Sequence, residues 1–184
     1  MVMTRLTQWL SEFCSWHARF KSGTLGVNEL PGYMQARADL GAILVLAQRL
    51  EIRAGSGARQ MVRVARAVPV EFDLPTGKAS SLTQDISASG LSALVGEGAA
   101  VGALVAFRLK LGRDTPAIVG TCRVVANIPV QGSVRMACTF QEISEEGRSR
   151  IESLVFDGIC SEIRVMLRVE QPKASGATPP PQVL

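Results

Sequence analysis

The stretch VPVEFDLPTGK, residues 68–78, decides the fold class of this protein. Every second residue from Val68 to Leu74 is apolar, and two of the positions between them are acidic. This two-residue period is typical of a β-strand with one buried face and one face toward water. The residues from Pro75 to Lys78 have the composition of a hairpin turn, so we expect a second, antiparallel strand to follow.

The alternation continues along the chain as far as Phe140. It predicts about six short strands, two of them weaker than the rest, separated by turns. The expected strands lie around 68–74, 79–86, 91–95, 103–111, 118–124 and 134–140. Short, evenly spaced strands favour a small barrel. We therefore expect a mainly β fold, a six-stranded antiparallel β-barrel with flanking helices.

Helical periodicity flanks the predicted barrel on both sides. A helix is expected at about 3–20, where large apolar residues recur at three- and four-residue steps. We call these residues the apolar stripe: Leu6, Trp9, Leu10, Phe13, Trp16 and Phe20. A loop at 21–32 and a second helix at about 33–51 would complete an N-terminal helical hairpin. A C-terminal helix should begin near Ser144, whose side chain can cap it.

Glycine and proline divide the chain into parts. Gly55 and Gly57 break the helical pattern, so we place a domain boundary there. Residues 1–54 are then an N-terminal helical module, and residues 55–170 are the barrel domain with its C-terminal helix. Residues 171–184 are rich in proline and poor in apolar residues, which predicts a disordered tail.

Net charge and cysteine spacing indicate which partners and which cellular compartment the protein has. The formal net charge of +4 suits an anionic partner such as a nucleotide, but it does not require nucleic acid or a membrane surface. The cysteines are too far apart for a CxxC pair and are expected to be buried free thiols: Cys14, Cys122, Cys138 and Cys160. With no secretory signal and no apolar run near the ~20 residues of a membrane span, we expect a cytoplasmic protein.

Two short motifs carry the chemistry. The first is RxxxR, formed by Arg59 and Arg63 directly before the first predicted strand. The second is DxSxxG, formed by Asp85, Ser87 and Gly90 between the second and third predicted strands. Each motif alone is weak, since basic edges and Asx-type turns are common. Their occurrence in this order around a Val-Pro-Val strand is much rarer.

The pair of motifs resembles the PilZ domain family over about residues 58–167. In that family the two motifs lie on a six-stranded barrel followed by a helix and bind the bacterial second messenger cyclic di-GMP. The helical hairpin ahead of the barrel is also similar to that of PilZ proteins common in myxobacteria. The resemblance implies a non-catalytic receptor that relays the dinucleotide to a protein partner in motility, pili, polysaccharide synthesis or a related output.

The resemblance also implies a role for each motif residue. Arg59 and Arg63 would grip the phosphates or the O6 and N7 atoms of guanine, which suit the planar fork of arginine. Asp85 would accept N–H groups of the guanine edge, and Ser87 would add a contact to base or phosphate. Gly90 would let the backbone pass close to the ligand or adopt a positive φ.

Two neighbouring residues affect how much ligand the site can hold. Arg66 is a possible accessory contact. Many family members carry a further arginine immediately before RxxxR, but this chain has Ala58 there. The loss of one cation favours a single bound cyclic di-GMP over a stacked pair.

Other functional classes have less support. The sequence shows no metal-ligand cluster, no nucleophile–base pair and no phosphate-cradling glycine loop, so we expect no enzyme, no catalytic residues, no metal and no cofactor. A degenerate adaptor that acts through protein contacts alone remains an alternative. So does a weak nucleic-acid-binding module that uses Arg53 with the other arginines. The apolar stripe also suggests a homodimer through the N-terminal helices.

Overall fold

The computed structural model describes residues 2–50 and 61–169. The elements are α1 (Val2–Lys21), α2 (Leu30–Leu50), β1 (Pro69–Leu74), β2 (Gly77–Ser87), β3 (Gly90–Val95), β4 (Leu104–Leu109), β5 (Ile118–Val130), β6 (Ser133–Ile143) and α3 (Glu145–Val169). The strands form a closed barrel in the order β1-β2-β3-β6-β5-β4, and every neighbouring pair is antiparallel. The predicted barrel with flanking helices is confirmed.

Three predictions fall outside the described residues. They are the domain boundary at Gly55 and Gly57, the disordered tail at 171–184, and the position of Arg59. The division into domains therefore stays a prediction.

The barrel core follows the alternation of the sequence. On β1, Val70, Phe72 and Leu74 are buried while the residues between them are exposed. The other strands add inward-facing residues: Ile86, Leu91, Ala93, Val95, Val105, Phe107, Leu109, Ile118, Cys122, Val124, Met136, Cys138 and Phe140. Because the sheet closes on itself, one apolar face per strand is enough to enclose this core.

The structure corrects two predicted boundaries. The helix α2 begins at Leu30, so Pro31 lies in its first turn and not in the preceding loop. Proline is suited to a first helical turn because its missing N–H would have no intrahelical partner there. The strand β5 continues to Val130, six residues beyond the predicted end, because its last residues pair with the start of β6.

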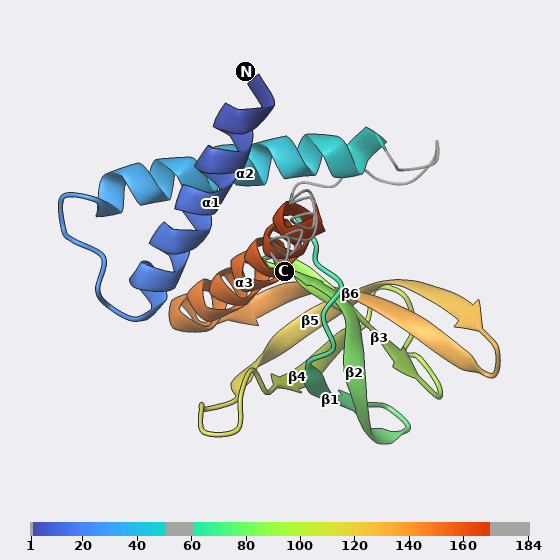
Figure 1. Ribbon diagram of the computed structural model, residues 1–184. Coiled ribbons are helices and arrows are strands. Elements are labelled where there is room, and N and C mark those ends of the chain that lie inside the picture. The colour runs from blue at the N-terminus through green and yellow to red at the C-terminus, as the bar shows by residue number, and fades with distance from the viewer. Residues whose placement is uncertain (1, 51–60, 170–184) are drawn as a thin grey trace, which may run out of the picture.

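The apolar stripe is partly covered within the chain. In Figure 1 the helix α3 lies between the barrel and the two N-terminal helices. Phe13 is 1% exposed and packs against Tyr33 of α2 and Phe156 of α3, with ring centroids 6.0 and 5.8 Å away. Leu6 at the start of the stripe is 50% exposed. The middle of the stripe at Phe13 is thus covered by α2 and α3 of the same chain, its start at Leu6 is exposed, and the homodimer remains a prediction.

Polar groups fix the angle between the three helices. The buried ring of His17 lies 2.7 Å from the Tyr33 hydroxyl through Nδ1 and 3.1 Å from Asp157 through Nε2. Lys21 donates to the same carboxylate at 2.6 Å. Burial opposes the ionisation of Asp157, but the hydrogen bonds from His17 and Lys21 outweigh it and hold the pKa of Asp157 below its ordinary value.

The helix α3 joins the helical layer to the barrel. Its first turn is capped by Ser144, whose Oγ accepts a hydrogen bond from the Gly147 N–H at 3.0 Å, as the sequence predicts. Ile151 is fully buried, and Gly158 allows the helix to approach Val64 closely. None of the helices within the described ranges is long and apolar enough to cross a membrane.

We predict that the helical layer contributes strongly to stability. Phe13→Ala should lower the free energy of unfolding by about 3–4 kcal/mol, because it removes a buried aromatic ring and leaves a cavity. Leu6→Ala, on the same helix but half exposed, should change it by less than about 1 kcal/mol. Urea unfolding followed by circular dichroism measures both. Equal effects of the two substitutions would contradict the packing described here.

Candidate ligand-binding site

An irregularity in β2 places the carboxylate of the second motif. The register between β2 and β3 shifts between Thr83 and Asp85, which is a β-bulge with Gln84 as the extra residue. Thr83 and Ile86 are therefore both buried, although they are three positions apart. In a regular strand Asp85 would share the buried face with Thr83. The bulge instead turns Asp85 to the outer wall of the barrel.

Asp85 organises a cluster of polar side chains from four segments. It accepts a hydrogen bond from Ser92 of β3 at 2.7 Å and one from the Arg63 guanidinium at 3.0 Å. Arg135 of β6 also donates to Asp85 and reaches Ser92 with its Nε at 3.1 Å. We call Arg63, Asp85, Ser92 and Arg135 the outer-wall cluster.

Electrostatics favour the ionised form of Asp85. The side chain is 14% exposed, and this burial alone would raise its pKa. The hydrogen bond from Ser92 and the positive charges of Arg63 and Arg135 outweigh burial and hold the pKa of Asp85 below its ordinary value. At neutral pH the cluster thus contains one carboxylate between two guanidinium groups.

Arg63 comes from the extended segment that precedes β1. Its neighbours Val62 and Val64 are buried, and Val64 pairs with Ile86 of β2 through two main-chain hydrogen bonds of 3.0 Å. Alternation along this segment directs the Arg63 side chain to the opposite face, where Asp85 lies. The structure thus brings together Arg63 of the first motif and Asp85 of the second.

Arg135 is the member of the cluster that sequence reasoning missed. It lies on the outward face of β6, directly before the buried Met136, and its side chain is 40% exposed. Its approach to Asp85 depends on β6 pairing with β3, which neither motif reveals. In the sequence, Arg135 is only an arginine on the polar face of a predicted strand. Its position indicates a role in the site only when the strand order is known.

The rest of the second motif shapes the turn between β2 and β3. Ser87 is fully buried; its hydroxyl donates to the Gly90 carbonyl at 3.2 Å and accepts from the Ser89 N–H at 3.3 Å. Gly90 does not have a positive φ, contrary to one of its two expected roles. A Cβ at Gly90 would lie 2.1 Å from the carbonyl oxygen of Cys138 on β6. Position 90 therefore requires glycine because β3 and β6 approach each other closely there.

Arg66, the expected accessory residue, is exposed. Its main-chain carbonyl accepts a hydrogen bond from the Thr83 hydroxyl, beside the bulge. Any contact of Arg66 with a ligand remains a prediction.

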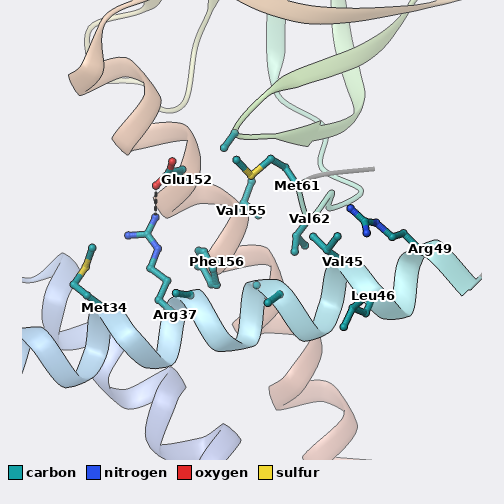
Figure 2. Close-up of a pocket in the computed structure, with 14 residues that line it drawn as sticks. Met34, Arg37, Val45, Leu46, Arg49, Met61, Val62, Glu152, Val155 and Phe156 are labelled. Carbon is teal, nitrogen blue, oxygen red and sulfur yellow. Dashed lines mark hydrogen bonds and ion pairs between the residues drawn. The ribbon is translucent and has the colours of Figure 1, made fainter. Parts of the chain in front are cut away.

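A groove with a volume of about 690 Å³ adjoins the turn on the side of the helices. Figure 2 shows Val45 and Leu46 of α2 on one side of it and Phe156 of α3 on another, with Met61 and Val62 at its edge. Ala88 of the β2–β3 turn also lines it. The groove is mainly apolar, whereas the outer-wall cluster is charged.

The outer-wall cluster can bind an anionic ligand that also carries a hydrogen-bonding edge. Two guanidinium groups offer planar sets of N–H donors, and the carboxylate offers acceptors between them. Among residues 2–50 and 61–169, no group of histidine, cysteine, aspartate and glutamate side chains is arranged to hold a metal ion. Fold and cluster together define a small barrel module with a group of charged side chains on its wall.

The PilZ domain model matches residues 58–157, just over half of the chain. The protein belongs to the PilZ domain family. No curated protein sequence matches it.

Solved structures share the barrel at low sequence identity. YcgR from Escherichia coli, in complex with cyclic di-GMP, is 13% identical with a TM-score of 0.52, over 61% of this chain and 50% of that one. The inhibitor of motility from Bacillus subtilis is 19% identical with a TM-score of 0.48, over 61% of this chain and 53% of that one. The matched region thus covers about half of the length of these two proteins.

We predict that Gly90 is needed for folding. Gly90→Ala should lower the free energy of unfolding by at least about 2 kcal/mol, because the new Cβ cannot fit against the β6 backbone. Gly96→Ala is the matched control, since a Cβ there would meet nothing within 4 Å. Thermal unfolding compares the two variants. A fully stable Gly90→Ala protein would show that β3 and β6 do not approach as described.

The lowered pKa of Asp85 predicts a specific dependence of stability on pH. Because its pKa is lower in the folded protein than in the unfolded chain, the Asp85 carboxylate stabilises the fold fully above pH of about 4. This contribution is lost as the pH falls through the lower, folded pKa. Asp85→Asn should therefore be less stable by about 1–3 kcal/mol at pH 7, and the deficit should shrink as the pH falls from 4 to 2.

Urea unfolding at pH 7, 4, 3 and 2 measures this deficit. The pKa of Asp157 is also lowered in the folded protein, so the stability of Asp85→Asn should still fall somewhat in acid. The control is Asp73→Asn, which removes an exposed surface pair with Lys78 and should change stability little at pH 7. A deficit that stays constant down to pH 2 would contradict the lowered pKa.

Proposed function

We propose that this protein is a non-catalytic receptor for cyclic di-GMP, which it binds at the outer-wall cluster. The observation that carries the proposal is the convergence of Arg63, Asp85 and Arg135 on one wall of a PilZ barrel. Support comes from the family and from YcgR, whose structure is a complex with cyclic di-GMP.

The chemistry of the ligand fits the two arginines. Cyclic di-GMP has two phosphodiesters and two guanine bases. A guanidinium can bind phosphate oxygens, or pair in a bidentate manner with O6 and N7 of guanine. Each guanidinium has five N–H donors; Arg63 directs one to Asp85, and Arg135 directs one each to Asp85 and Ser92. Donors thus remain for a ligand without breaking the cluster.

Asp85 serves this proposed site in two ways. Its ionised oxygens hold both arginines in place before the ligand arrives, which reduces the side-chain entropy lost on binding. A carboxylate is also an acceptor, so it can receive the N–H groups of the guanine Watson–Crick edge. Adenine lacks that pattern of donors, and the site should therefore prefer guanine.

The other motif residues have supporting roles in the proposal. Arg59 would add a further cation to the phosphates or a base. Ser87 and Gly90 would set the conformation of the turn beside the ligand, and Arg66 is an accessory candidate. With Ala58 in place of a further arginine, we expect one cyclic di-GMP per site.

The receptor is proposed to be cytoplasmic and to relay ligand binding to a protein partner. This partner would act in motility, pili, polysaccharide synthesis or a related process. The N-terminal helices are the natural place for this partner, because residues of α2 line the same groove as Ala88 of the β2–β3 turn. The same proposal includes a homodimer through the N-terminal helices.

We predict that both described arginines are required for binding. Arg63→Ala and Arg135→Ala should each weaken cyclic di-GMP binding by about tens- to hundreds-fold, which corresponds to about 2–4 kcal/mol for a lost charge-assisted contact. Arg63→Lys should restore little, because an ammonium cannot reproduce the planar fork. Calorimetric titration measures affinity and stoichiometry together.

Arg108→Ala is the control for this experiment. Arg108 is exposed on β4, a strand whose neighbours in the barrel are β1 and β5 and not β3 or β6. Its Nε lies 3.9 Å from a carboxylate oxygen of Glu71 on β1. Its loss should leave the affinity within about twofold, as expected for a remote surface charge. Unchanged affinity in folded Arg63→Ala and Arg135→Ala proteins would place the ligand elsewhere.

A further inference from the structure

The main chain at Arg63 is held by a side chain from the helical layer. The Oε1 atom of Gln48 on α2 accepts a hydrogen bond from the Arg63 N–H at 3.2 Å. The Nε2 group of the same amide donates to the Arg63 carbonyl at 2.8 Å. One side chain therefore satisfies both polar groups of the Arg63 backbone.

With these two hydrogen bonds, the extended segment at Arg63 and Val64 has hydrogen-bond partners along both of its edges. In an extended chain, the N–H and C=O groups of successive residues point to opposite sides. Those of Val64 point to Ile86 of β2, and those of Arg63 point the other way. A neighbouring strand would normally bind there with one N–H and one C=O. The amide of Gln48 offers the same donor and acceptor, and so takes the place of that strand.

We infer that Gln48 is a positioning residue for ligand binding, acting through Arg63. This inference rests on the proposed function, because Arg63 is its proposed ligand contact. Gln48 precedes the family-matched residues, which begin at 58, so this connection is an addition of the N-terminal helices to the barrel site. With its backbone fixed on both sides, Arg63 presents its guanidinium to Asp85 in one direction.

The connection gives the helical layer a direct route to the site. Val45, one turn before Gln48 on α2, and Val62, next to Arg63, both line the groove beside the turn. A displacement of α2 away from the barrel would stretch the two Gln48 bonds and release the Arg63 backbone. The reverse also holds, since a ligand that binds only the fixed form of Arg63 favours the docked position of α2.

The test uses one substitution at two positions of α2. Gln48→Met keeps the length of the side chain and the helical propensity, but removes both hydrogen bonds to Arg63. Gln35→Met is the matched control, because Gln35 is exposed on the same helix and bonds only to Asp39 in its own helix, at 2.9 Å, among the described residues. Calorimetric titration with cyclic di-GMP should show about tenfold weaker binding for Gln48→Met and a change of less than about twofold for Gln35→Met.

A second measurement reports on positioning without the ligand. Amide hydrogen exchange by NMR on the ligand-free proteins should show that the Arg63 amide exchanges at least about tenfold faster in Gln48→Met than in the wild type. The Val64 amide, which bonds to β2, should keep most of its protection. A general loss of stability would instead accelerate both amides.

The two measurements separate failure of this inference from failure of the proposed function. If wild-type protein does not bind cyclic di-GMP, the proposed function is wrong, and the role of Gln48 in ligand binding falls with it; faster exchange at Arg63 would then show a structural clamp only. If wild-type protein binds and Gln48→Met binds equally well, the proposed function stands and the positioning role is overturned. Weaker binding with unchanged exchange at Arg63 would overturn it too.

Discussion

The ion pairs of Asp85 with Arg63 and Arg135 are the interaction on which the site depends. They join an extended segment, β2 and β6, which are far apart in sequence. Without the carboxylate, two guanidinium groups would repel each other on one small patch of surface. With it, the pair is held together before any ligand arrives, and a net positive charge remains for an anion.

Three features of the fold make these ion pairs possible. The bulge at Gln84 turns Asp85 outward, and the strand order of the barrel puts β6 beside β3, so that Arg135 reaches across Ser92. On the other side, α2 supplies Gln48 to fix the backbone of Arg63. The helical layer is therefore connected to the site by hydrogen bonds as well as by the packing of α3 on the barrel.

The sequence predicted the barrel well because its signals are local. Alternating apolar residues predict the strands, and apolar residues spaced three and four positions apart predict the helices. The residue type at Ser144 predicts the cap of α3. Arg135 and Gln48 could not be found in this way, because their importance arises from strand order and helix docking. The end of β5 was missed because the residues after Val124 lose the alternation at a register shift between Val124 and Ala126. Pro31 was read as a loop residue, although a first helical turn accepts it equally well.

Discrimination between two cyclic dinucleotides tests the central claim most directly. Cyclic di-GMP and cyclic di-AMP share the phosphates but differ in the base edge that Asp85 and the arginines are proposed to recognise. In a calorimetric titration of the full chain, we expect saturable binding of cyclic di-GMP at one per site and at least about tenfold weaker binding of cyclic di-AMP. Equal affinity for both, or no binding of cyclic di-GMP, would contradict guanine recognition by the outer-wall cluster.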